Sequence, residues 1–148
     1  MRLPLLVAGL ALGVAIPVAA QQPTAADSAA VRQAALDYVD AIYRTDTTLV
    51  VKSVVPDLAK RGFYIPRGQT GYTSGAMTYS GLINTAKTWN AKGQVDPAKA
   101  PREVKILDML DQTASVKLTA QWGIDYMHLA RYDGKWMIVN VIWQSHPR

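Results

Sequence analysis

The sequence predicts an α+β domain in which helices come first and a curved antiparallel sheet follows. The helical patterns lie in the first two thirds of the chain, whereas strand patterns dominate from Ala114 to Gln144. Helices and strands that are segregated in this way favour helices packed on one face of a sheet, because each element must bury its apolar side. A chain of 148 residues suits one such domain.

The C-terminal strands carry the clearest signal. Apolar and polar residues alternate from Ala114 to Trp122, which is the period of a strand with one buried face and one wet face. Two more β-rich runs, 125–132 and 135–143, flank Asp133-Gly134, where glycine can take the positive φ of a tight hairpin turn. A further strand is predicted over 103–110. We expect these last strands to form an antiparallel meander.

The helical signals lie earlier in the chain. Asp27-Ser28 can cap a helix over 27–44, whose apolar stripe is spaced to lie on the sheet. Asp37 and Asp40 on its other face are interpreted as solvated charges and not as a carboxylate pair. A second helix can begin at Asp46, although 49–55 is rich in β-branched residues. A third helix is predicted over 78–90.

The segment between the second and third helices is predicted to be irregular. Pro56-Asp57 ends the second helix and is expected to open a short turn. A short strand is predicted over 62–65, and a glycine-rich loop is expected from Pro66 to Gly75.

The first twenty residues have the features of a signal peptide. Arg2 precedes an apolar run, and Val18-Ala19-Ala20 offers the small side chains that signal peptidase needs. We therefore expect a signal peptide over 1–20, a loose leader over 21–26, one domain over 27–144 and a tail over 145–148. The protein is expected to be exported, either periplasmic or secreted, with no membrane span after cleavage.

Composition excludes several kinds of site. Without cysteine the chain can form no disulfide, zinc-thiolate site or cysteine nucleophile. Its two histidines show no metal-binding spacing, so we expect no metal and no cofactor. The formal net charge is +5, and the basic residues, Lys60-Arg61 among them, are scattered and interpreted as a solvated surface. Nucleic-acid binding is not expected.

Three stretches resemble a known family. They are the run from Trp122 through 125–129 and 133–144, the segment Pro56 to Gly62, and the helix with Tyr38 that precedes Asp46. Together they resemble the Putative lumazine-binding family of the nuclear transport factor 2-like (NTF2-like) superfamily, alongside the SnoaL-like proteins. The resemblance implies a cone-shaped barrel in which a strongly curved antiparallel sheet wraps around the N-terminal helix. It also implies a cavity at the open end and a homodimer.

Aromatic side chains are the candidates to line that cavity. Pockets for small molecules have mostly apolar walls with a few placed polar groups. We expect a small apolar or aromatic molecule to bind there without self-contained catalysis, and the candidate ligand-binding residues are Tyr38, Tyr64, Trp89, Trp122, Tyr126 and Trp143.

Two other functions remain open at this point. The first is an enzyme of the SnoaL or ketosteroid-isomerase kind, with Asp125 or His128 as general base and Tyr126 as oxyanion donor. Residues three apart in a regular strand face opposite sides, so this pair needs a bulge near Gly123. The second is a protein-interaction module. Whether Asp125 or Tyr126 and His128 face inward depends on the hairpin register.

Overall fold

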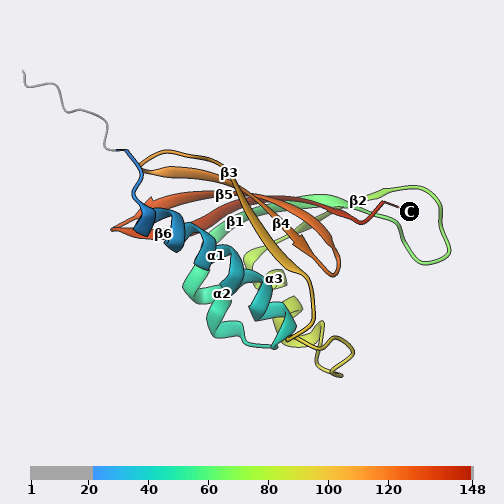
Figure 1. The fold of residues 1–148 in the computed structure, drawn as a ribbon. Coiled ribbons are helices and arrows are strands. Elements are labelled where there is room, and N and C mark those ends of the chain that lie inside the picture. Colours follow the sequence, from blue (N-terminus) through green and yellow to red (C-terminus); the bar gives the residue numbers. More distant parts are fainter. Residues whose placement is uncertain (1–21, 148) are drawn as a thin grey trace, which may run out of the picture.

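Three helices cover one face of a six-stranded sheet (Figure 1). The computed structural model describes residues 22–147, and the predicted signal peptide lies outside them. The helices are α1 (Ala25–Tyr43), α2 (Thr47–Ser53) and α3 (Tyr79–Thr88). The strands are β1 (Val54–Tyr64), β2 (Thr73–Met77), β3 (Arg102–Met109), β4 (Thr113–Ala120), β5 (Gly123–Tyr132) and β6 (Lys135–Ser145). The predicted α+β class is confirmed, and the curved sheet stays open instead of closing into a barrel.

The strand order is β2-β1-β6-β5-β4-β3. Strands β3 to β6 form the predicted antiparallel meander. Strand β1 pairs in parallel with β6, and β2 completes the edge antiparallel to β1. This arrangement places β1, from the first half of the domain, beside the last strand β6 in the middle of the sheet.

Strand β1 corrects the sequence prediction most strongly. The turn expected at Pro56-Asp57 is wrong, because one strand runs from Val54 to Tyr64. The short strand predicted over 62–65 is the end of this longer strand. Its pairing with β6 shifts register between Val54 and Ala59, and Pro56 lies in that irregular stretch. Proline has no N–H to donate to a ladder, so strands tolerate it at irregularities of this kind. Strand β2 occupies part of the predicted loop.

Helix α1 begins two residues earlier than predicted. Thr24 is its N-cap and forms a reciprocal capping box with Asp27. The interpretation of Asp37 as a solvated charge is wrong, because α2 packs beside the side chain and buries it. Its carboxylate forms a salt bridge with Lys52 of α2, with Nζ and Oδ2 2.8 Å apart. Asp40 pairs with Arg102 over 2.6 Å.

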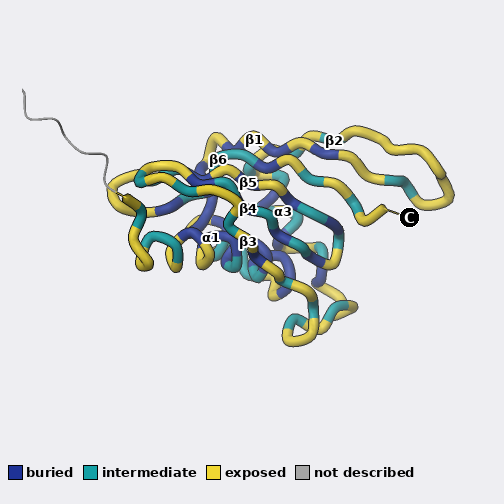
Figure 2. Tube along the Cα trace, turned by 45° about the horizontal axis from the view of Figure 1, so that its top comes forward, coloured by how far each residue is buried: buried dark blue, intermediate teal, exposed yellow. Residues whose placement is uncertain are grey.

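The hairpin register decides which residues of β5 face the core. Tyr132 pairs with Lys135, so the turn has two residues, and both take positive φ, 49° at Asp133 and 80° at Gly134. Asp125 and Met127 consequently point toward the helices. The buried residues concentrate between the helices and the sheet (Figure 2). A register shift between His128 and Leu129 marks a bulge, which bends the ladder.

Candidate functional site

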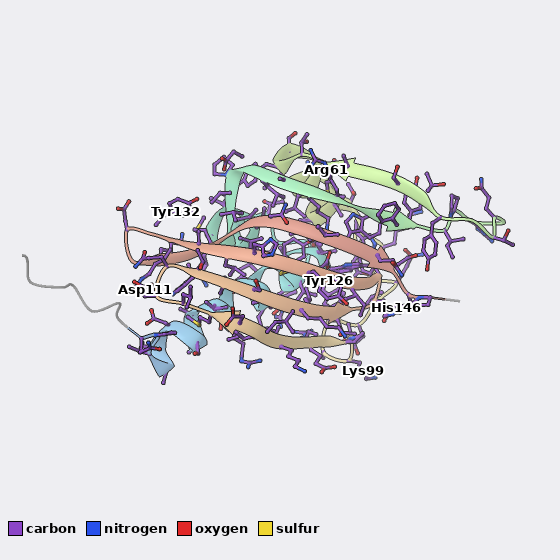
Figure 3. All side chains as sticks on the ribbon, turned by 90° about the horizontal axis from the view of Figure 1, so that it is seen from above. Arg61, Lys99, Asp111, Tyr126, Tyr132 and His146 are labelled. Atoms are coloured by element: carbon purple, nitrogen blue, oxygen red, sulfur yellow. The ribbon has the colours of Figure 1, made fainter. Side chains whose placement is uncertain are left out.

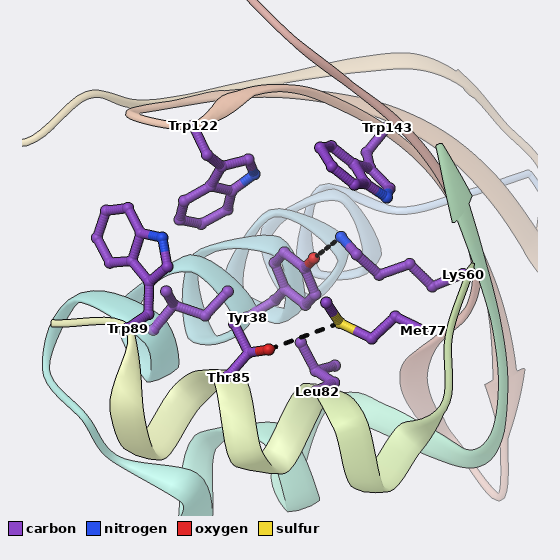
Figure 4. A pocket seen from close by; sticks show the side chains of 9 residues that line it. Tyr38, Lys60, Met77, Leu82, Thr85, Trp89, Trp122 and Trp143 are labelled. Atoms are coloured by element: carbon purple, nitrogen blue, oxygen red, sulfur yellow. Dashed lines mark hydrogen bonds between the residues drawn. The ribbon is translucent and has the colours of Figure 1, made fainter. Parts of the chain in front are cut away.

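A cavity of about 280 Å³ lies between the sheet and helices α1 and α3 (Figure 4). It is lined by Tyr38, Ile42, Lys60, Met77, Leu82, Thr85, Trp89, Trp122 and Trp143. The buried members Tyr38, Ile42, Lys60 and Leu82 form its floor, and the other five are half-buried and form its rim. This volume is near the small end of the roughly 300–1,000 Å³ typical of ligand pockets.

Indole rings supply most of the apolar wall. Trp89 and Trp122 meet edge to face, with ring centroids 5.6 Å apart. The Trp122 ring also lies edge to face with the Tyr38 ring, with ring centroids 6.4 Å apart. Trp143 comes from β6 on the other side of the floor, as Figure 4 shows. Because the rings around the cavity lie at different angles, an aromatic ligand can pack against both ring faces and ring edges.

Tyr43 supports this wall from behind, and sequence reasoning missed it. Its ring lies 5.5 Å from that of Trp122 and 5.9 Å from that of Trp89. Its hydroxyl donates to the Pro101 carbonyl at 2.7 Å and accepts from the Gln121 amide at 2.8 Å. Both ends of the side chain are therefore fixed, which holds the two indoles in place.

A polar cluster is buried at the floor. Lys60 Nζ donates to the Tyr38 hydroxyl and to Asp125 Oδ1, the latter over 3.0 Å. The indole N–H of Trp122 donates to Asp125 Oδ2 at 2.7 Å. Asp125 itself is fully buried behind Lys60. The two opposite charges compensate each other where neither could remain alone.

The cluster keeps the Tyr38 side chain neutral. Burial raises the pKa of the Tyr38 phenol well above its usual value, and the nearby Asp125 carboxylate raises it further. Both effects disfavour the phenolate. The Lys60 ammonium also lies over two rings, 5.2 Å from the Tyr38 centroid and 5.5 Å from that of Trp143. Such cation–π contacts add to the stabilisation of a buried charge.

Lys60 reaches the cavity because β1 is a regular alternating strand at this point. Leu58, Lys60 and Gly62 face inward, whereas Ala59 and Arg61 are exposed. The interpretation of Lys60 as part of a solvated surface is thus wrong. Residues 58–62 show no apolar–polar alternation in the sequence, so no local signal indicated that Lys60 faces inward. At Gly62 an added Cβ would lie 2.4 Å from the Trp143 indole, so glycine lets that ring lie against β1.

The structure brings together four of the six aromatic residues proposed from the sequence. Tyr38, Trp89, Trp122 and Trp143 line the cavity. Tyr64 and Tyr126 do not. The Tyr64 ring stacks on Trp143, with centroids 6.0 Å apart, and is itself partly exposed. Tyr126 points out from the opposite face of the sheet (Figure 3).

The other proposed site residues are separated by the sheet. Asp125 faces the helices, whereas His128 is exposed on the outer face with Nδ1 3.2 Å from Asn140 Oδ1. The two side chains therefore cannot act on one substrate from this arrangement. His146, interpreted as a loose terminal residue, has Nε2 2.8 Å from the Ala120 carbonyl oxygen. In the described part of the chain, no cluster of three residues could hold a metal ion.

Comparison with known proteins agrees with this architecture. The model of the Putative lumazine-binding family matches residues 26–144. The chain belongs to that family. Among solved structures, an NTF2-like protein from Shewanella baltica superposes with a TM-score of 0.65 at 18% identity, covering 86% of this chain and all of that one. A ketosteroid isomerase-like protein from Erwinia carotovora atroseptica gives 0.52 at 15% identity, covering 81% and 96%.

One relative with a named activity is also similar in sequence. Aldolase FrzH from Cladobotryum sp. is 28% identical over 96 residues, which cover 61% of this chain and 75% of the aldolase. Among the described residues, no helix is both long enough and apolar enough to cross a bilayer.

Proposed function

We propose that the protein binds a small aromatic molecule in the cavity between α1, α3 and the sheet. The observation that carries this proposal is the combination of three indole rings with a buried polar floor. An apolar wall supplies most of the binding free energy, and a few placed polar groups orient the ligand. A volume of about 280 Å³ suits a molecule of roughly two fused rings.

The names of the relatives fit this proposal. The family description includes lumazine, a two-ring heteroaromatic compound, as a ligand. The ketosteroid isomerase-like neighbour and the aldolase are named for chemistry on carbonyl compounds. These names suggest the first compounds to test, and the binding site itself is argued from the cavity.

The contacts of Asp125 support binding without self-contained catalysis. Both of its oxygens already accept hydrogen bonds, one from Lys60 and one from Trp122. Proton abstraction by Asp125 would break its ion pair with Lys60. Among the described residues that line the cavity there is no histidine and no carboxylate, because Asp125 lies behind Lys60.

An enzyme is the second candidate, and the closeness of Asp125 to Tyr38 favours it. In that case Asp125 is the base and Tyr38 the oxyanion donor, in place of His128 and Tyr126. Turnover of an aromatic ketone that falls more than about a hundredfold in Asp125→Asn would establish the enzyme. A protein-interaction module becomes the better account if no small molecule binds.

Binding can be tested by thermal shift and by quenching of tryptophan fluorescence with a panel of two-ring aromatic compounds that includes lumazine. We expect at least one compound to bind, and Trp122→Ala to weaken it several-fold, because an aromatic contact contributes about 0.5–1.5 kcal/mol beyond area burial. Tyr126→Ala, on the outer face of the sheet, is the matched control and should bind normally. Equal effects of both substitutions would count against the cavity.

We also propose that the protein is exported, which rests on Arg2, the apolar run and Val18-Ala19-Ala20. Intact-mass measurement after expression in a Gram-negative host should give a chain that begins at Gln21. Full-length protein recovered from the cytosol would contradict export and would leave the ligand-binding proposal untouched.

A further inference from the structure

Two hydrogen-bond donors at the cavity floor have no acceptor in the described chain. Lys60 Nζ carries three N–H groups, and two of them are used, by the Tyr38 hydroxyl and by Asp125. Tyr38 accepts from Lys60, and its own O–H donates to no described residue. Both side chains line the cavity and both are buried.

Buried donors of this kind need an acceptor. A donor that has left water without gaining a new hydrogen bond keeps its full desolvation penalty, which destabilises the site. The Lys60 amine and the Tyr38 hydroxyl are joined by a hydrogen bond, so they lie side by side (Figure 4). Their remaining hydrogens can therefore be donated to acceptors at neighbouring positions in the cavity. One oxygen with two lone pairs can accept from both. Burial keeps the Tyr38 phenol protonated and therefore able to donate.

The charge of the cluster limits what that oxygen can belong to. Lys60 is the only cationic side chain among the described residues lining the cavity, and the Asp125 carboxylate at 3.0 Å already neutralises it. A ligand carboxylate or phosphate would bring a second negative charge beside Asp125 with no cation left to compensate it. A neutral carbonyl oxygen accepts two hydrogen bonds without that cost.

We infer that Lys60 and Tyr38 form a donor pair for the carbonyl oxygen of a neutral aromatic ligand. This inference rests on the proposed function and specifies its ligand class. The rings of the ligand lie among Trp89, Trp122 and Trp143, and its carbonyl points to the floor. Asp125 does not touch the ligand; it is a positioning residue that holds the Lys60 ammonium.

Three probes of one shape test the inference: acetylnaphthalene, ethylnaphthalene and naphthoate, which carry a carbonyl, no acceptor and an anion. By isothermal titration we expect acetylnaphthalene to bind about tenfold more tightly than ethylnaphthalene, since a hydrogen bond from a charged donor stabilises by about that factor. Naphthoate should bind more weakly than the ketone. The infrared carbonyl band of bound acetylnaphthalene should move to lower frequency, because both donors polarise the bond.

Matched variants assign the effect to the two side chains. Tyr38→Phe should reduce the frequency shift and the preference for the ketone, whereas Tyr126→Phe on the outer face should change neither. Lys60→Met alone leaves Asp125 buried without its partner and can fail to fold. The double variant Lys60→Met/Asp125→Asn removes both charges and leaves only the Tyr38 hydroxyl to donate, so its preference for the ketone over ethylnaphthalene should fall below that of the wild-type protein.

The outcomes separate this inference from the function on which it rests. If the ketone and ethylnaphthalene bind wild-type protein equally well, the donor pair is refuted and the aromatic cavity stands. Tighter binding of naphthoate than of the ketone would also refute it, since the floor would then select an anion. If none of the probes binds at millimolar concentration, both the inference and the proposed function are wrong.

Discussion

The indole N–H of Trp122 donates to Asp125 Oδ2 over 2.7 Å, so a rim residue of the cavity is tied to the buried charge beneath its floor. The other carboxylate oxygen of Asp125 holds Lys60 at 3.0 Å. One carboxylate thus orients both an aromatic wall and the cation at the floor. Loss of its charge should therefore affect stability as well as binding.

Asp125→Asn should lower the free energy of unfolding by about 3 kcal/mol, because it leaves the Lys60 ammonium buried without its counter-charge. The asparagine can still accept from Trp122, so the loss reports mainly on the ion pair. Urea denaturation measures it, and Asp57→Asn, at an exposed position of β1, is the control. A loss below about 1 kcal/mol for Asp125→Asn would indicate that the pair is not formed in solution.

Trp136→Ala should cost about 3–5 kcal/mol, because the side chain is only 4% exposed and its removal leaves a large void. Tyr132→Ala provides the comparison. It lies at the same hairpin but is 52% exposed, and should cost less than about 1 kcal/mol. Thermal and urea unfolding of both variants would test this, and similar losses would place Trp136 on the surface.

Gly123→Ala should be strongly destabilising, whereas Gly134→Ala should cost only about 1 kcal/mol. Both glycines have positive φ, 148° and 80°. At Gly123 an added Cβ would also lie 2.0 Å from the Gln144 carbonyl oxygen, but at Gly134 it would meet nothing within 4 Å. Soluble yield and melting temperature distinguish the two. Equal losses would mean that β5 and β6 do not approach as closely as described.

Asp27 should make stability depend on acid pH. Hydrogen bonds from the Thr24 hydroxyl and amide, then from the Trp136 indole, hold its pKa below the usual 3.8. A carboxyl group with a lowered folded-state pKa stabilises the protein fully above its unfolded value. That contribution is lost as pH falls below about 3.8. Melting temperatures from pH 6 to about pH 2 should fall less steeply in Asp27→Asn than in wild type. Parallel curves would contradict this.

We expect a homodimer that pairs the outer faces of two sheets. Ser115, Lys117 and Thr119 present a partly polar row there, and Lys117 pairs across the sheet with exposed Tyr126. A face of this kind can form an isologous contact. Light scattering at micromolar concentration should give twice the chain mass, and Tyr126→Asp should reduce it to one. A monomeric wild-type protein would exclude the dimer.

The sequence predicted the C-terminal half of the fold well. In 114–122 and around Asp133-Gly134, side-chain periodicity and turn chemistry agree with the tertiary structure, so local signals were sufficient. They failed at β1, where Pro56 suggests a turn and the strand instead continues because β6 and the helices stabilise it. Propensity is a weak guide where long-range packing decides.

That failure at β1 concealed Lys60, the cationic side chain at the floor of the candidate site. Four wall residues could be proposed because apolar and aromatic side chains are the usual lining of a small-molecule pocket. Lys60 could not, because its burial depends on Tyr38 and Asp125, which are distant in sequence and meet it only after folding. The face of the sheet on which Asp125 lies depends on the hairpin register, and the sequence alone left that register open.

The parallel pairing of β1 with β6 has a consequence for synthesis of the chain. Val54 pairs with Ile138, so β1 and β6 cannot join in the centre of the sheet before Ile138 has been synthesised. A nascent chain can form its helices early, but β1 has no partner on this side until the last strand has left the ribosome. A chain that stays loosely folded until its end emerges is also a chain that a translocation channel can still thread.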